Sequence, residues 1–293
     1  MGRVNHKPGI LAGVHKFIDD KLGVRDVGTT SPHYKHLESC RQLSDKEIEN
    51  FDGAAFVESI YRKLEENWTG GSGSSKNWRW EPRPTLTKGK DGKGHKGAEV
   101  PFERTIAILS EMRHFGLNDA WTNQMPVASK LTDEPEGRLA IDLVHRCRDG
   151  VYDFIELKLP GDKSHETPLA AAIEVLIYGL LYVFSRVNIE KLKYDQVGKR
   201  VLGDDTKQVN LLVVAPQKFY LDERKPGQQK YDIAWFQRGL NRGLAAFLTT
   251  AHPNLALSMC FQFEAIDDAF LTPDPTLDHG FSLIFRPVPV YPQ

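Results

Sequence analysis

The chain has 293 residues, a formal net charge of −1, and 40% hydrophobic and 26% charged residues. That length allows one large or two modest domains, and the composition is ordinary for a globular protein. With almost no net charge the chain has no overall basic field, so any contact with nucleic acid must be local. Three widely spaced cysteines fit a reducing compartment, and the first residues lack an apolar signal core, so we expect a cytoplasmic protein.

The N-terminal third has helical spacing. Apolar residues recur at helical intervals in 8–22 and 45–68, and a capping box is indicated by Ser44 and Glu47. We therefore expect residues 1–98 to form a helical extension.

A basic, glycine-rich segment closes this extension. Residues 76–97 contain seven Lys or Arg against two acidic residues. This excess predicts local binding of nucleic-acid phosphates, with aromatic side chains stacking on bases. The candidates are Lys88, Lys90, Lys93 and Lys96 for phosphate, and Trp78 and Trp80 for stacking. The alternative is a solvated loop with a short edge strand.

The central part begins with an amphipathic helix and three strands. A helical stripe runs through residues 99–115, and a strand is plausible over 121–128. Two further runs, 138–147 and 151–159, have strand character and are separated by Arg-Asp-Gly. We expect a three-residue hairpin loop in which Gly150 takes the left-handed conformation.

The hairpin carries the charged residues that matter most. In its second strand Glu156 and Lys158 alternate with aliphatic residues, so both leave the sheet on one face. A three-residue loop pairs Cys147 with Val151 and places Asp142 opposite Glu156. Opposed carboxylates repel each other, and a divalent cation held by oxygen ligands would offset that repulsion. The alternative is an exposed hairpin face with a surface Glu–Lys pair.

A long apolar helix is predicted over 165–187. Its length approaches that of a membrane span, but Glu174 lies inside it, so a buried helix is favoured. Glu174 and Tyr178 share one helical face, and a carboxylate in so apolar a helix needs a polar partner. The run 209–215 is then expected to be a buried strand parallel to the previous one.

The C-terminal part continues the same pattern. A helix is predicted over 231–250, and strands over 255–266 and 281–290 that extend or edge the sheet. We expect residues 99–293 to form one α/β core.

The order helix, three strands, helix, strand, with Asp142 on the second strand and Glu156-x-Lys158 on the third, resembles the PD-(D/E)XK nuclease superfamily. The resemblance covers roughly residues 99–215. It departs from the family motif where Ile141, not proline, precedes the aspartate. It implies a restriction-endonuclease-like αβββαβ core with a mixed central sheet flanked by helices.

The resemblance also implies a chemistry. Asp142, Glu156 and the backbone carbonyl of Leu157 would hold Mg²⁺ or Mn²⁺. Lys158 would orient the attacking water, donate to the phosphate, or act as base if burial depresses its pKa. A carboxylate of the first helix would assist. Glu103 is the first candidate, ahead of Glu111 and Glu99, although a first-turn glutamate is also favoured there by the helix dipole alone.

The predicted function is therefore metal-dependent hydrolysis of nucleic acid, with DNA favoured over RNA. Glu174 and Tyr178 would support the site from the second helix. The partners expected are nucleic acid, no membrane, and a possible second copy or partner subunit. Two alternatives stay open, a nuclease fold that binds without cleaving and an unrelated α/β ligand-binding protein.

Overall fold

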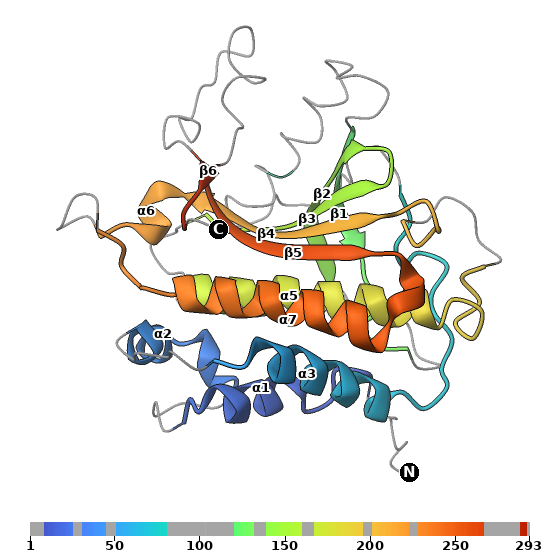
Figure 1. Ribbon diagram of the computed structural model, residues 1–293, viewed down its shortest axis with the longest axis horizontal. Coiled ribbons are helices and arrows are strands. Elements are labelled where there is room, and N and C mark those ends of the chain that lie inside the picture. Colours follow the sequence, from blue (N-terminus) through green and yellow to red (C-terminus); the bar gives the residue numbers. More distant parts are fainter. Residues whose placement is uncertain are drawn as a thin grey trace, which may run out of the picture.

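The computed structural model describes residues 9–25, 31–44, 51–80, 103, 120–131, 139–159, 167–195, 201–222, 228–266 and 288–291. Within these residues the protein is an α/β fold built on one mixed sheet, as the sequence predicts (Figure 1).

The sheet has five main strands and one short one, ordered as they occur in the chain. They are β1 (Ala120–Pro126), β2 (Ala140–Arg148), β3 (Val151–Leu157), β4 (Gln208–Pro216), β5 (Ser258–Ile266) and the two-residue β6 (Val288–Pro289). β1, β2 and β3 form an antiparallel meander, β3, β4 and β5 run parallel, and β6 pairs antiparallel with β5. The C-terminal strands β5 and β6 thus extend the central sheet, as expected, although residues 281–287 of the predicted last strand lie outside the described residues.

The β2–β3 hairpin differs in detail from the prediction but keeps its register. Arg148, not Cys147, pairs with Val151, so the loop is the two residues Asp149 and Gly150. The register shifts between Arg146 and Arg148, which makes Cys147 a bulge residue and restores the predicted pairing beyond it. Gly150 has φ 73°, the left-handed conformation that the turn was expected to need.

The register beyond the bulge decides which side chains are neighbours. Leu143 pairs with Ile155, and continuing by one residue places Asp142 opposite Glu156. A two-residue loop without the bulge would have opposed Asp142 to Leu157 and mixed the two faces.

Helix α5 (Pro168–Val187) connects β3 to β4, which explains why these strands are parallel. Thr167 caps its N-terminus by accepting a hydrogen bond from the backbone N–H of Ala170, and Pro168 occupies the first turn. By length and composition α5 alone, among the described helices, could cross a membrane, yet 94% of its apolar window is buried inside the protein. The prediction of a buried helix is confirmed.

The remaining helices complete the layers. They are α1 (Val14–Leu22), α2 (Leu37–Ser44), α3 (Gly53–Asn67), the single-turn α6 (Gln217–Tyr220), α7 (Ala234–Ala251) and the 3₁₀ turns η1 (His33–Lys35) and η2 (Pro253–Leu255). Figure 1 shows α5 and α7 along one face of the sheet, with α1, α2 and α3 as a further layer beneath them. Helix α5 therefore lies between the sheet and the N-terminal helices.

Helices α3 and α7 cross very closely. A Cβ atom on Gly53 would lie 1.8 Å from the backbone oxygen of Gly239, and one on Gly243 would lie 2.2 Å from the oxygen of Gly53. Only glycine permits this backbone approach. The crossing ties the N-terminal helices to the layer that covers the sheet.

Two N-terminal predictions need correction. Helix α3 begins at Gly53, with Asp52 as its cap, and not at residue 45. Ser44 belongs to α2, where its hydroxyl donates to the carbonyl of Cys40, and Asp52 takes the capping position of α3. Glu47, the other residue of the predicted capping box, lies outside the described residues. The expected helix 99–115 lies outside the described residues except for Glu103.

Candidate functional site

Lys158 lies at the centre of a buried cluster of charged side chains. It follows β3 directly and its backbone N–H donates to the carbonyl of Val214, which fixes it beside β4. Its Nζ lies 2.5 Å from Oε1 of Glu156 and 3.6 Å from Oε2 of Glu174. Glu156 is 2% exposed and Lys158 6% exposed, so both charges are held away from bulk solvent.

Asp142 approaches the cluster from β2. Its Oδ2 accepts a hydrogen bond of 3.0 Å from the backbone N–H of Leu157, which holds the carboxylate against the end of β3. The side-chain amide of Gln124 donates to Asp142 Oδ1 at 3.4 Å and to Oε2 of Glu103 at 2.7 Å. Gln124 thus links the aspartate to the buried carboxylate predicted on the first helix.

One face of helix α5 is turned toward this cluster. Glu174, Tyr178 and Tyr182 are spaced by four along the helix and lie on one face. Glu174 contacts Lys158, and the Tyr182 ring packs edge-on against Phe154 at 5.4 Å between centroids. Burial and then the negative charges of Glu156, Glu174 and Asp142 raise the pKa of Tyr178 well above its usual value. The expectation that Glu174 and Tyr178 face the charged strands is met.

The electrostatics of Glu156 favour an added cation. Burial, followed by the charges of Asp142 and Glu174, raises its pKa well above the usual value, and Lys158 offsets only part of this. Its Oε2 is buried and has no hydrogen-bond partner among the described residues. A divalent cation bound through this oxygen would satisfy it and balance the excess of carboxylates.

The carboxylates around Lys158 do not form a tight all-protein cage. Among the described residues, three ligand atoms of His, Cys, Asp or Glu come within 4.8 Å of one another only at His145, Cys147 and Asp153. A cation beside Glu156 would therefore take two carboxylates at most from the described residues, with backbone and water oxygens completing its shell.

No protein-family model, no curated protein and no solved structure matches this chain.

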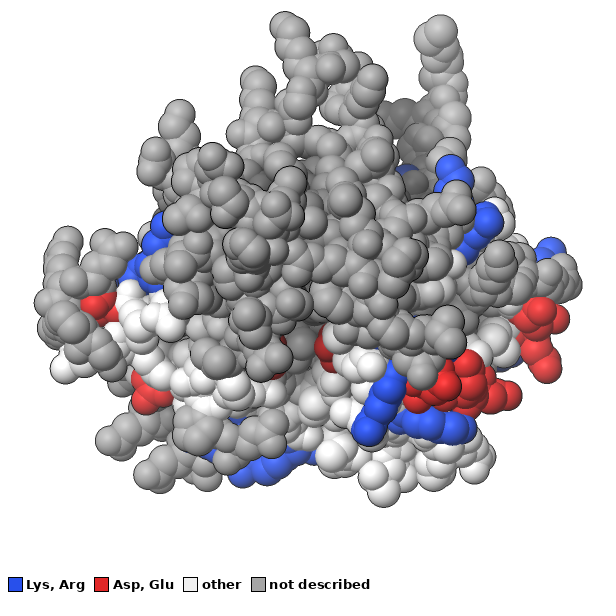
Figure 2. Space-filling model, turned by 90° about the horizontal axis from the view of Figure 1, so that it is seen from above, with Lys and Arg blue, Asp and Glu red and all other residues white. Residues whose placement is uncertain are grey.

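The described residues among those predicted to bind nucleic acid, Trp78 and Trp80, are not part of this cluster. Trp78 is fully buried, stacks on Phe154 and donates from its indole N–H to Ser185, so it cannot stack on a base and its assignment was wrong. Trp80 is half-buried and packs edge-on against Tyr152. Lys88, Lys90, Lys93 and Lys96 lie outside the described residues. Figure 2 shows Lys and Arg side chains and Asp and Glu side chains at several places around the edge of the view.

Two groups of polar residues were missed. Gln124 was not singled out because a lone glutamine in a strand carries no pattern, and its signal is structural, a φ of 53° at a non-glycine position. His145, Cys147 and Asp153 lie in the two predicted hairpin strands but were not singled out. Their spacing, with His and Cys two apart on one strand and Asp on its partner, was the available signal.

Proposed function

We propose that this protein is a metal-dependent nuclease of the PD-(D/E)XK type that hydrolyses phosphodiester bonds, with DNA as the favoured substrate. The observation that carries the proposal is the placement of Asp142, Glu156 and Lys158. They meet at one end of a β2–β3 hairpin, on the face of the sheet that α5 covers.

The strand arrangement supports the same reading. An antiparallel three-strand meander followed by a helix and a parallel strand agrees with the αβββαβ core that the resemblance implies. Glu103 is helical and buried, and it reaches the cluster through Gln124. In this proposal Glu103 is the catalytic carboxylate of the first helix.

The metal ligands proposed are Asp142, Glu156 and the backbone carbonyl of Leu157. When bound there, Mg²⁺ or Mn²⁺ would stabilise charge developing on the scissile phosphate and lower the pKa of a bound water. The unpartnered buried oxygen of Glu156 and the excess of carboxylates fit such an ion. The Leu157 N–H holds Asp142 in place for this role.

The other residues of the cluster would position the reacting groups and donate hydrogen bonds. The ammonium of Lys158 would orient the water and donate to a phosphate oxygen, and the Glu174 carboxylate on α5 would hold that ammonium in place. Tyr178 would remain a neutral phenol at any ordinary pH, because its pKa is raised by burial and by the nearby carboxylates. Gln124 would fix the relative positions of Glu103 and Asp142.

The decisive experiment is a cleavage assay with Mg²⁺ or Mn²⁺ over single-stranded, duplex and branched DNA and over RNA. Lys158→Ala should abolish cleavage but spare much of the metal affinity, since lysine does not ligate. Asp142→Asn should abolish both, because it removes a hard anionic ligand. Lys16→Ala, at an exposed position of α1, is the matched control and should cleave like the wild type.

Two outcomes would change the proposal. Cleavage by Lys158→Ala at the wild-type rate would remove the chemistry from this cluster. Binding of nucleic acid without cleavage of any substrate would favour a nuclease fold that serves as a binding module or as a subunit of a larger complex.

A further inference from the structure

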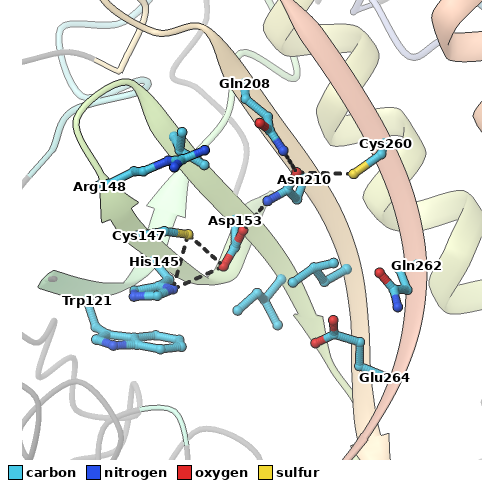
Figure 3. A pocket seen from close by; sticks show the side chains of 13 residues that line it. Trp121, His145, Cys147, Arg148, Asp153, Gln208, Asn210, Cys260, Gln262 and Glu264 are labelled. Carbon is cyan, nitrogen blue, oxygen red and sulfur yellow. Dashed lines mark hydrogen bonds and ion pairs between the residues drawn. The ribbon is translucent and has the colours of Figure 1, made fainter. Parts of the chain in front are cut away.

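A row of polar side chains crosses the opposite face of the sheet. Trp121 pairs with His145, His145 with Asp153, Asp153 with Asn210 and Asn210 with Cys260, one residue from each of β1 to β5. Asp153 alternates along β3 with Phe154 and Glu156, so this row lies on the face away from the Lys158 cluster. It lines a cavity of about 720 Å³ together with Gln262 and Glu264 (Figure 3).

Three atoms of this row converge. Asp153 Oδ2 lies 3.0 Å from His145 Nδ1 and 3.0 Å from Cys147 Sγ, and these two atoms are 3.5 Å apart. Figure 3 shows the three side chains pointing toward one another at the edge of the cavity. Cys147 reaches this position from the bulge in β2, and bulges often redirect a side chain next to a functional site.

Neighbouring residues orient two of the three, Asp153 and His145. Asn210 donates from Nδ2 to Asp153 Oδ1 at 2.6 Å, which leaves Oδ2 for His145 and Cys147. Gln208 and Cys260 both donate to Asn210 Oδ1, so the orientation of this amide is fixed. The ring of Trp121 stacks on His145 at 4.0 Å between centroids and 11° between planes. Outer partners of this kind are what set ligand direction in metal sites.

The distances suit a tetrahedral ion. Zinc bond lengths of about 2.3 Å to sulfur and about 2.0–2.2 Å to nitrogen and oxygen place tetrahedral ligand atoms about 3.4–3.6 Å apart. The observed separations of 3.0 to 3.5 Å reach that spacing with shifts of about half an ångström. A thiolate and a carboxylate would also neutralise the charge of a divalent ion.

A nucleophilic triad is the other arrangement that Cys, His and Asp can make. In a triad the imidazole binds the nucleophile with one nitrogen and the carboxylate with the other. Here the same atom, His145 Nδ1, faces both Cys147 and Asp153. The geometry is that of three ligands around one point, not of a proton relay.

We infer that His145, Cys147 and Asp153 form a second metal site, selective for Zn²⁺ or a similar borderline transition ion over Mg²⁺. Sulfur and imidazole ligands select for such ions, whereas Mg²⁺ requires oxygen. The described residues supply three ligands, and a zinc ion takes a fourth from solvent or from a group that enters the adjoining cavity. This site is independent of the proposed nuclease centre and lies on the other side of the sheet.

The test uses Co²⁺ as a coloured substitute for Zn²⁺ in the full-length, metal-free, reduced protein. Binding should give a thiolate-to-cobalt charge-transfer absorption that saturates at one equivalent, is displaced by Zn²⁺ and survives excess Mg²⁺. Cys147→Ser should lose this absorption, and Asp153→Asn should weaken Zn²⁺ binding by more than about tenfold, since even loss of an outer partner costs that much. Glu156→Gln, on the opposite face of the sheet, should keep both the thiolate-to-cobalt absorption and the Zn²⁺ affinity of the second site.

Folding of each variant is checked by circular dichroism, and a second measurement does not need a variant. Zn²⁺ should protect Cys147 of the wild type from alkylation, read by peptide mass spectrometry, with Cys260 as the internal comparison. No thiolate absorption in the folded wild type, or its persistence in Cys147→Ser, would overturn the assignment. Alkylation of Cys147 at the same rate with and without Zn²⁺ would do the same.

Discussion

The ammonium nitrogen of Lys158 lies 2.5 Å from a carboxylate oxygen of Glu156, and both side chains are almost completely buried. Burying two charges costs several kcal/mol of desolvation for each, which their mutual attraction barely offsets. Such a pair therefore adds little to the stability of the fold. We propose that it is present at the end of the hairpin, beside Asp142 and Glu174, because the chemistry of the site needs charged groups there.

The first prediction concerns the coupling within this pair. Lys158→Met should lower the free energy of unfolding by about 3–5 kcal/mol, because it leaves Glu156 buried without its cation. Combining it with Glu156→Gln should recover most of that loss. Chemical denaturation of the two single variants and the double variant, without divalent metal, measures the coupling. Additive losses in the double variant would show that the two side chains are energetically independent.

The second prediction concerns Gln124 and rests on the proposed nuclease activity. Gln124→Ala removes the amide that joins Glu103 to Asp142, so cleavage should fall by about 10- to 100-fold, as for other partners that orient metal ligands. Gln42→Ala, at an exposed position of α2, is the control. Steady-state cleavage at several Mg²⁺ concentrations checks this. If Gln124→Ala cleaves like the control, the amide does not position the site.

The third prediction concerns pH. Burial, and then the charge of Asp153, raises the pKa of Glu264 from 4.5 to about 7. The folded protein therefore binds more protons than the unfolded chain between these values, and the stability contributed by this group falls as pH rises through that window. Glu264→Gln removes the effect. The free energy of unfolding of Glu264→Gln, relative to that of the wild type, should therefore increase by about 2–3 kcal/mol between pH 4.5 and pH 8.

Urea unfolding of the wild type and Glu264→Gln at both pH values, in metal-free buffer, measures this difference. The comparison cancels every other titrating group that the substitution leaves alone. Equal pH dependence in the two proteins would place Glu264 in a solvated setting.

The fourth prediction concerns the crossing of α3 and α7. Gly53→Ala would place a methyl group against the backbone of Gly239, and backbone atoms cannot move aside as a flexible side chain can. The free energy of unfolding should fall by about 3 kcal/mol. Ala55→Ser, on the exposed side of the same turn, should stay within about 0.5 kcal/mol of the wild type. Thermal unfolding compares the two. A Gly53→Ala variant as stable as Ala55→Ser would mean that the helices can separate freely.

The fold was predictable where local pattern and tertiary packing agree. Helix α5 is apolar along almost its whole length and is buried except at Glu174 and Val187. Glu156 and Lys158 alternate with aliphatic residues in the sequence because they share the face of the sheet that carries the charged cluster. The hairpin loop was misjudged because a bulge at Cys147 compensates a shorter loop. Two different turns give the same register, and the alternation of residues reports only the register.

The site was predictable where residue spacing alone brings side chains together. Asp142 and Glu156 meet through strand register, and Glu174 and Tyr178 share a face through helical spacing. Trp78 was misjudged because its sequence neighbours are polar and basic, whereas its environment is set by Phe154 and Tyr182, far along the chain. No local pattern encodes such a contact.

The position of α5 between the sheet and the N-terminal helices has a consequence for synthesis. The ribosome produces this apolar segment before β4 and β5, which pack against it in the finished protein. Until those segments emerge, the nascent chain displays a stretch with the hydropathy of a membrane span. We expect chains truncated after α5 to be retained by chaperones or to aggregate, and chains that extend past β5 to become protease-resistant. Limited proteolysis of stalled ribosome complexes of increasing length would locate the transition. The helix that anchors one side of the charged cluster is thus the segment most dependent on the rest of the chain arriving.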